Sequence, residues 1–317
     1  MGVSMLRSLR LVASKLFSFL LSIFIISSVS FFLLRLIPGS PFSNDRHLAP
    51  ELLANLEARY GLDKPLFEQY LAYITKIFTE FDFGPSLKYS NRDVLDILLD
   101  AMPVSFSLGG IAFLISTSLG ISAGIYLAYR KLNPKKFSPL YILLNFYADS
   151  AISLPSFVSA GLLILVFGLK LDLLPVALWE GPEYMILPAL TLSVAPTAYL
   201  IRITRAAFAE AYSQPYVKTA LAKGLDKYTI LFKHTLINAL LPILAYLGPL
   251  FAILITGSFV VEFVYALPGM GKYFVTAFIN RDYFLVSAVV VVFSTVLTMS
   301  NSLVEILNPL LNPKLSR

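Results

Sequence analysis

Side chains that could perform catalysis are scarce in this chain of 317 residues. It contains no cysteine and only two histidines, His47 and His234. A thiol nucleophile and a thiolate metal site are therefore excluded. No HExxH metalloprotease motif and no GxxxxGK[ST] phosphate-binding loop occurs in the sequence, so zinc proteolysis and ATP hydrolysis lack their usual residues. We predict no catalytic residue, no metal site and no cofactor bound by the chain, which is therefore not expected to be an enzyme.

The composition indicates a membrane protein. Hydrophobic residues make up 57% of the chain and charged residues 14%, against about 25% charged in a soluble domain. A soluble globular enzyme and a disordered chain are both excluded. The apolar runs long enough to cross the ~30 Å hydrocarbon core of a bilayer lie at residues 16–34, 101–129, 137–169, 184–201, 235–261 and 283–304.

The six runs predict an all-α polytopic membrane protein with six transmembrane helices. Backbone polar groups in lipid must be satisfied within their own segment, which favours helices, and the alternating pattern of a barrel is missing. The first run exceeds a signal-peptide core in length and is read as a retained helix. The run at 137–169 is interrupted by one charge, Asp149, which we place near the middle of the bilayer. A charge there must face a partner or a water-filled path.

The charges orient the chain. Six spans place both termini on one side, and that side carries 15 Lys and Arg against two acidic residues, Glu210 and Asp226. The opposite side carries 10 basic and 15 acidic residues. The excess of Lys and Arg predicts that both termini are cytoplasmic. The net charge of +6 is thus a topology signal, and nucleic-acid binding is excluded.

The spans divide the chain into four parts. Residues 1–35 form the N-terminus and first helix, 36–100 an extracytoplasmic segment, 101–306 the core, and 307–317 a cytoplasmic tail. The patterns at 50–60 and 66–78 predict two helices in the extracytoplasmic segment, with Pro50 and Pro65 in their first turns. Residues 202–234 form a long cytoplasmic loop without the composition of a linker, which favours a function for it.

A short helix is predicted within this loop, from Ser213–Pro215 to Gly224. Ser213 is a candidate cap, Pro215 suits the first turn, and Gly224 suits the left-handed residue that ends a helix. Thr219, Ala220 and Ala222 keep the helix thin. It is interpreted as a docking element for another protein, or as an interfacial helix on anionic lipid headgroups.

The order of several motifs resembles one family. Tyr216-x-x-Thr219-Ala220-x-Ala222-Lys223-Gly224-Leu225, with His234 and Asn238-Ala-Leu-Leu-Pro242 after it, is similar to the coupling loop of ABC importer permeases. The similarity is to the first permease subunit of the dipeptide/oligopeptide type. It continues through the following motifs, which extend over most of the chain: Pro38-Gly-Ser-Pro41, Tyr60-Gly-Leu-Asp-Lys-Pro65, Gln69-Tyr70, Ser153-x-Pro155-x-Phe157, Leu187-Pro188, Glu262, Pro268-Gly-Met-Gly271 and Arg281-Asp-Tyr283.

The resemblance implies a type I ABC importer (MetI-like) permease fold that forms half of a translocation pore. The implied partners are a second, homologous permease, two ATPase subunits that hold ATP and magnesium, an extracytoplasmic substrate-binding protein and the lipid bilayer of the cell membrane. The helix at 213–225 would couple to an ATPase. The residues implied in that contact are Tyr216, Thr219, Ala220, Ala222, Lys223 and Gly224.

Two further sets of residues are candidates for the cargo route. Asp149 and Ser153 would line the translocation path, although a protonated Asp149 bonded to a neighbouring helix is the alternative. Glu262, Pro268, Gly269 and Gly271 would form an outer gate or touch the binding protein, although a plain connection between spans is also open. Gly109, Gly110, Gly120 and Gly124 are interpreted as helix-packing positions.

The predicted function is ATP-driven import of dipeptides or oligopeptides through a binding-protein-dependent ABC importer. Import of oligosaccharides or another small solute by the same architecture is the alternative within the class. A passive channel and a membrane receptor are the alternatives from other classes. A channel needs no ATPase, and a receptor does not accumulate cargo, so uptake measurements separate these cases.

Overall fold

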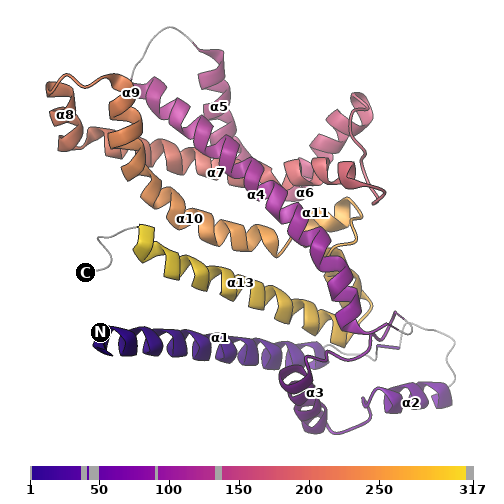
Figure 1. The fold of residues 1–317 in the computed structure, drawn as a ribbon. Helices are drawn as coiled ribbons and strands as arrows, with labels where there is room; N and C mark the ends of the chain where they lie inside the picture. Colours follow the sequence, from indigo (N-terminus) through magenta and orange to yellow (C-terminus); the bar gives the residue numbers. More distant parts are fainter. Residues whose placement is uncertain (1, 37–40, 43–49, 90–91, 133–137, 312–317) are drawn as a thin grey trace. The chain divides into compact units, whose positions relative to one another are not determined.

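The structure is a computed structural model that describes residues 2–36, 41–42, 50–89, 92–132 and 138–311. Its described residues are mainly helical (Figure 1). The chain forms two compact units, one from residues 1–104 and 268–299 and the other from 105–267 and 300–317. His47, Lys135 and Lys136 lie outside the described residues. So do Pro38 and the end of the predicted C-terminal tail.

The first unit contains the predicted extracytoplasmic helices. Its elements are α1 (Gly2–Leu36), α2 (Pro50–Arg59), α3 (Leu66–Glu80), the start of α4 (Val94–Leu132), α12 (Met270–Ile279) and most of α13 (Tyr283–Leu311). The helix predicted at residues 50–60 is α2, which begins at Pro50, and the one predicted at 66–78 is α3, with Pro65 as its N-cap. Both predictions are confirmed.

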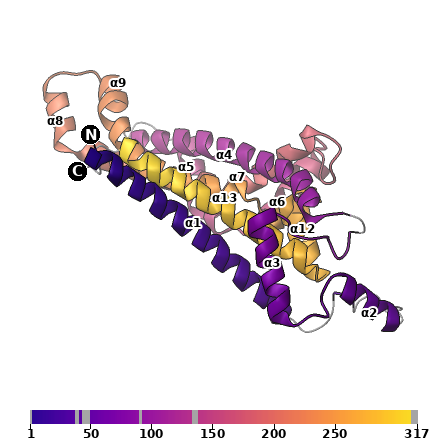
Figure 2. The same cartoon turned by 60° about the horizontal axis from the view of Figure 1, so that its bottom comes forward.

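Aromatic rings hold α3 against α1. The two helices meet near the C-terminal end of α1 (Figure 2). The ring of Phe31 lies 5.4 Å from that of Tyr70 and 5.2 Å from that of Tyr73. Arg35 stacks on Phe31 at 3.6 Å and donates to Gln69 Oε1 at 3.1 Å. Cation–π and edge-to-face contacts of this kind each contribute about 0.5–1.5 kcal/mol. They tie α3 to α1.

The second unit is built around α7 (Ile186–Ser213), which contacts most of the unit's other elements. Besides the greater part of α4, the unit contains α5 (Pro139–Ser150), η1 (Ala151–Ser153), α6 (Ser156–Leu163), η2 (Ile164–Lys170), η3 (Pro182–Met185), α8 (Pro215–Ala222), α9 (Lys227–Thr229), η4 (Ile230–Leu236), α10 (Ile237–Ile255) and α11 (Phe259–Val264). The element η2 and the element η4 are π-helical, and η1 and η3 are 3-10 helices.

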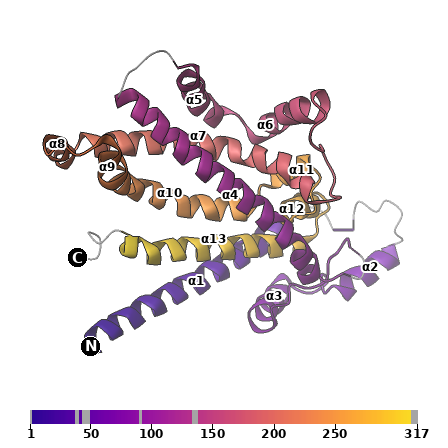
Figure 3. The same cartoon turned by 45° about the horizontal axis from the view of Figure 1, so that its top comes forward.

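Small residues bring α4 close to α7 and α10. In Figure 3, α4 crosses both of these helices. A Cβ added to Gly120 would lie 2.5 Å from Leu200 Cβ, and one added to Gly124 would lie 2.5 Å from Thr204 Cβ. A Cβ at Gly109 would collide with the backbone of Leu254. The packing role predicted for these three glycines is confirmed. Gly110 has no atom within 4 Å of its added Cβ, so the same prediction is wrong for Gly110.

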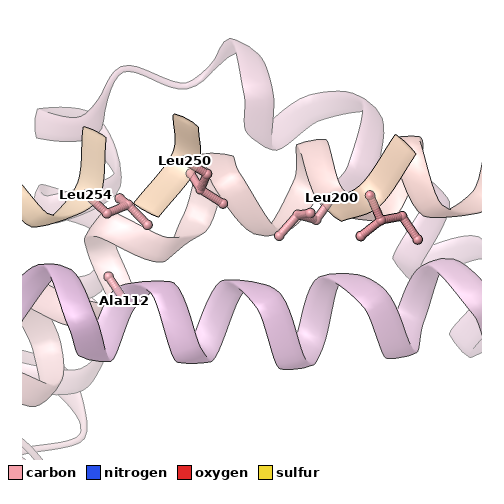
Figure 4. Packing of buried hydrophobic residues seen from close by; sticks show 5 residues of the cluster. Ala112, Leu200, Leu250 and Leu254 are labelled. Carbon is pink, nitrogen blue, oxygen red and sulfur yellow. The ribbon is translucent and has the colours of Figure 1, made fainter. Parts of the chain in front are cut away.

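An apolar cluster fills the space between these helices. Its buried members are Ala112, Leu200, Ile243, Leu250 and Leu254. Figure 4 shows Leu200, Leu250 and Leu254 gathered against the helix that carries Ala112. Because close-packed interiors tolerate few voids, this cluster fixes α4, α7 and α10 as one scaffold.

The run at 137–169, predicted as one of the six spans, is not one continuous helix. Five helical segments of the described residues are long and apolar enough to cross a membrane: Ala13–Leu36, Val94–Lys131, Pro182–Ser213, Ile230–Val264 and Tyr283–Ser302. The sixth run is divided into α5, η1 and the shorter apolar segment Ser156–Lys170. Pro155 is the cause, since the residue before a proline is driven out of the α region. Leu154 accordingly has φ −82° and ψ 120°.

The start of the predicted loop at 202–234 is also wrong, because the helix before it continues to residue 213. Residues 202–213 continue α7 as regular helix, and Arg202 and Arg205 lie within it. The Arg205 guanidinium donates to Asn145 Oδ1 on α5, so it fastens α5 to α7. The irregular part of the loop is therefore confined to the residues between α7 and η4.

Candidate functional site

The short helix α8 lies between α7 and the π-helical start of α10, at one end of the second unit (Figure 2). Pro215 occupies its first turn as predicted. The predicted cap is wrong, because Ser213 belongs to α7 and donates to the carbonyl of Glu210 at 2.8 Å. Gln214 is the N-cap instead, in an extended conformation with φ −69° and ψ 151° and without a side-chain cap bond. The residue before Pro215 is thus held out of the helix, which separates α8 from α7.

The C-terminus of α8 is a Schellman motif. Gly224 has φ +73° and donates to the carbonyl of Leu221 at 3.0 Å, while Leu225 donates to the carbonyl of Ala220 at 3.3 Å. These are the two bonds that close a helix through a left-handed residue. The prediction for Gly224 is confirmed. The turn has a defined exit direction, since only one backbone geometry makes both bonds.

The inner face of α8 is anchored by side chains. Val217 and Ala220 are buried and form a cluster with Ile230 of η4, with Tyr212 packed against it. Tyr216 donates from its hydroxyl to the carbonyl of Ala211 at 3.1 Å. Ala220, one of the six predicted coupling residues, therefore faces inward and positions the helix.

The other five predicted coupling residues are exposed. They are Tyr216, Thr219, Ala222, Lys223 and Gly224. The exposed face of α8 is narrow because Ala222 and Gly224 are small, and it carries the charge of Lys223. It is followed by Asp226, whose Oδ1 accepts from the backbone of Tyr228 and of Thr229 at 3.0 Å each. The pKa of Asp226 is lowered by its hydrogen bonds, of which the bond from the Thr229 side chain has the largest effect and the backbone bonds add to it.

Asp149 and Ser153 lie at the break between α5 and α6. Asp149 is in the last turn of α5 and Ser153 closes η1, and both are exposed. Asp149 is therefore not inside a continuous helix as predicted. The two residues are nevertheless only four positions apart and lie just before the non-helical residues Leu154 and Pro155, which interrupt the apolar segment. Backbone of that kind at membrane depth is tolerated where protein or water covers it.

Glu262 is fully buried in α11. A Cβ added to Gly257 would collide with the Glu262 carboxylate, and Gly257 has φ +82°. Ser258 then caps α11 by accepting from Val261 N at 3.3 Å. The sharp turn between α10 and α11 thus requires glycine for its conformation and for the space that Glu262 occupies. The buried Glu262 carboxylate is therefore an inner anchor of this turn, and its role in an outer gate stays a prediction.

Pro268, Gly269 and Gly271 belong to the first unit and introduce α12. Gly269 is the N-cap in extended conformation, and Gly271 is buried in the first turn. The stretch from 262 to 282 is therefore largely helical, in α11 and α12, and is not a plain connection.

A buried carboxylate that the sequence analysis did not single out joins two distant parts of the first unit. Asp282 accepts from Ser86 Oγ at 2.5 Å, from Leu87 N at 3.2 Å and from Leu285 N at 3.3 Å. Burial raises the pKa of Asp282 and these hydrogen bonds partly oppose it. The motif Arg281-Asp-Tyr283 marked the residue, but its partner Ser86 has no sequence signal.

The described residues contain no group of three His, Asp or Glu that could hold a metal ion. One stretch, Gly120-Ile-Ser122-Ala-Gly124, has the spacing of a hydrolase nucleophile elbow. It lies inside α4, where Gly120 and Gly124 pack against α7. The strand-to-helix turn that such an elbow requires is not formed at these residues.

Known protein families match this chain over most of its length. Residues 120–317 match the family described as the binding-protein-dependent transport system inner membrane component, and residues 8–109 match the N-terminal family of such membrane components. The chain is 41% identical over 309 residues to the oligopeptide transport system permease protein OppB of Haemophilus influenzae, covering 97% of this chain and 99% of that protein. It is 41% identical over 294 residues to the dipeptide transport system permease protein DppB of Bacillus subtilis, with coverages of 93% and 94%.

A solved structure supports the fold. The crystal structure of an amino acid ABC transporter with histidines superposes with a TM-score of 0.52 at 16% identity, covering 68% of this chain and 94% of that chain. At this identity the likeness concerns the arrangement of helices alone. The family matches, the near full-length relatives and the membrane-length helices establish the identity of the chain. It belongs to the inner membrane components of binding-protein-dependent transport systems and is a multi-pass permease subunit of an ABC importer.

Proposed function

We propose that this permease subunit imports dipeptides or oligopeptides and receives the mechanical signal of ATP hydrolysis through α8. The observation that carries the proposal is the construction of α8, which is anchored on one face by Val217 and Ala220 and is exposed on the other. An element that transmits motion must be stiff and must present a free surface. The exposed Tyr216, Thr219, Ala222 and Lys223 would contact an ATPase subunit.

The partners follow from this arrangement. The chain would form half of a pore with a second, homologous permease, and would be driven by two ATPase subunits on which ATP and magnesium are bound. An extracytoplasmic binding protein would deliver the cargo. Both termini would be cytoplasmic, because α8 must then reach the ATPases and because Lys and Arg gather in the segments on that side.

The proposed cargo is peptide because the relatives named above are oligopeptide and dipeptide permeases that match the chain nearly end to end. Asp149 and Ser153 would line the path at the break between α5 and α6. Both are exposed there, and a carboxylate in a water-filled path suits the cationic amine of a peptide. Pro268, Gly269 and Gly271 would lie near the outer mouth, with Glu262 as a buried anchor of the preceding turn.

The test is uptake by the complete transporter in proteoliposomes. The chain is reconstituted with its second permease and ATPases, and binding protein is supplied outside. ATP-dependent accumulation of a radiolabelled tri-alanine peptide, with none of maltotriose, is the expected result. Accumulation of maltotriose alone would overturn the peptide assignment, and uptake of either solute without ATP would indicate a passive channel.

A further inference from the structure

Two tyrosines of the second unit are arranged unlike the others. The rings of Tyr199 on α7 and Tyr246 on α10 lie 4.6 Å apart at an interplanar angle of 37°. They belong to neighbouring helices that the apolar cluster around Leu200 and Leu250 holds together. Aromatic pairs at this distance are favourable beyond their buried area, so the two phenol rings form one surface.

Tyr199 is the exposed residue of an otherwise buried stretch. Tyr199 is 43% exposed, whereas all the remaining side chains between residues 187 and 201 are buried or half-buried. Its neighbour Leu200 faces the cluster with α4 (Figure 4). The central helix of the unit thus presents a single large side chain at this level, and that side chain is amphipathic.

The hydroxyls of this pair also lack partners among the described residues. Other tyrosines of the same unit are satisfied within the chain. Tyr147 donates to the carbonyl of Val194 at 2.8 Å, and Tyr265 shares a 2.7 Å hydrogen bond with Thr191. A polar group at membrane depth without a hydrogen bond is costly. The Tyr199 and Tyr246 hydroxyls must therefore meet water, a ligand or a partner subunit.

Two prolines lie on the same face of α10 as Tyr246. Pro242 precedes it by four residues and Pro249 follows it by three, positions that share one face of a helix. Both prolines and Ala245 are exposed. A proline has no N–H for the carbonyl four residues earlier, so the carbonyls of Asn238 and Ala245 lose their usual helix donor. This face offers hydrogen-bond acceptors as well as aromatic rings.

We infer that Tyr199 and Tyr246 form a cargo-contacting surface in the translocation path, which binds the peptide by stacking on its aromatic side chains and by hydrogen bonds to its backbone. The occupant is the cargo itself, because rings, hydroxyls and free carbonyls together match a peptide and do not match acyl chains. The inference rests on the proposed function. It assigns a specificity-determining role to two residues outside the motifs of the coupling loop.

The absence of cysteine from the sequence makes an accessibility test direct. Tyr199→Cys and Tyr246→Cys are made in the complete reconstituted transporter and treated with a charged methanethiosulfonate reagent. Leu114→Cys, on the exposed apolar face of α4 (64% exposed), is the matched control. We expect labelling at positions 199 and 246, slowed by peptide-loaded binding protein, and little labelling at position 114.

Uptake separates stacking from the hydroxyl. Tyr199→Phe keeps the ring pair, and Tyr199→Ala removes it. With Ala-Phe-Ala and Ala-Ala-Ala as probes, Tyr199→Ala should reduce uptake of the phenylalanine peptide about twofold to tenfold more than uptake of tri-alanine, the range expected for one aromatic pair. Tyr199→Phe should reduce uptake of both peptides equally.

The outcomes are distinct. If the unsubstituted transporter imports both peptides but position 199 is unlabelled, or if Tyr199→Ala leaves the ratio of the two peptides unchanged, the cargo-contacting role is wrong while peptide import stands. If the unsubstituted transporter imports neither peptide under ATP, the proposed function fails first and the inference fails with it.

Discussion

Asp282 accepts a 2.5 Å hydrogen bond from the hydroxyl of Ser86, a residue 196 positions earlier in the chain. Ser86 Oγ in turn accepts from the backbone N–H of Lys88 and of Tyr89 at 3.2 and 2.9 Å. One carboxylate thereby orders the turn before α4 and caps the start of α13. Both residues are buried, so this pair fastens the segment before α4 to the start of α13.

Replacement of Asp282 should destabilise the first unit. Asp282→Ala leaves the Ser86 hydroxyl and the Leu87 N–H buried without their acceptor, which costs about 1–3 kcal/mol for a buried polar group. Asp282→Asn keeps one acceptor oxygen and should cost less. Thermal unfolding of the purified chain in detergent measures both. Equal melting temperatures for Asp282→Ala and the unsubstituted chain would show that the bond network is not stabilising.

The same carboxylate predicts a pH dependence. Burial raises the pKa of Asp282 above its ordinary value of 3.8, so between 3.8 and the raised value the folded chain binds more protons than the unfolded chain. Stability from this group is therefore full below 3.8 and decreases as the pH rises through the raised value. Melting curves from pH 3.5 to 7 should show this decrease. The D282N variant should lack this component, and an identical pH profile for both chains would contradict the assignment.

The class of the fold could be predicted from sequence because hydrophobic length is a sufficient signal for a span. The broken run at 137–169 shows where that signal ends. Hydropathy measures apolarity and not helix continuity, and Pro155 with its preceding Leu154 decides the geometry locally. If Pro155 is taken as a helix breaker, the sequence predicts that the run is divided at this residue.

The two ends of α8 could be predicted from the sequence, whereas the side chains that pack its inner face could not. Pro215 and Gly224 carry conformational requirements that the sequence states directly. Ala220 reads as one more small residue, and only the contact with Val217 and Ile230 shows that it faces inward. The pairs Ser86–Asp282 and Tyr199–Tyr246 join residues far apart in the chain, and a single sequence contains no information on such proximity.

The contact between α4 and α10 predicts a sharp difference between adjacent glycines. A Cβ at Gly109 would collide with the Leu254 backbone, whereas a Cβ at Gly110 meets nothing within 4 Å. Gly109→Ala should destabilise the second unit by about 1–3 kcal/mol, the range of overpacking. Gly110→Ala should be neutral or slightly stabilising, since alanine favours helix by about 1 kcal/mol. Melting temperatures in detergent test the pair, and similar values for both variants would contradict the close approach.

Asp149 predicts a charge preference in transport. Asp149→Asn removes a negative charge from the exposed break between α5 and α6, and uptake of a lysine-containing tripeptide should fall about fivefold relative to tri-alanine, as expected for a solvated pair worth about 1 kcal/mol. Asp172→Asn is the matched control, because Asp172 is exposed, has φ 49° and loses the same charge. Competition uptake with both peptides measures the ratio. If Asp149→Asn and Asp172→Asn give the same ratio, Asp149 does not face the cargo.

Gly224 predicts that transport depends on the direction in which the chain leaves α8. Its added Cβ meets nothing within 4 Å, so a substitution there acts through φ +73° and not through collision. A left-handed non-glycine residue costs about 1–2 kcal/mol, and asparagine tolerates this conformation best. Gly224→Val should therefore lower peptide uptake and peptide-stimulated ATP hydrolysis about tenfold with normal amounts of the chain in the membrane, and Gly224→Asn should stay close to the unsubstituted chain.

A second Schellman motif provides the control for this strain. Gly61 ends α2 with φ +66°, has nothing within 4 Å of its added Cβ, and is followed by Leu62, which donates to the carbonyl of Glu57 at 2.8 Å. Gly61→Val introduces the same backbone strain outside the coupling loop. Because α2 does not face an ATPase in the proposed topology, Gly61→Val should lower stability like Gly224→Val but leave peptide uptake and peptide-stimulated ATP hydrolysis close to those of the unsubstituted chain. Equal losses of transport in the two variants would mean that general destabilisation, and not the exit geometry of α8, limits uptake.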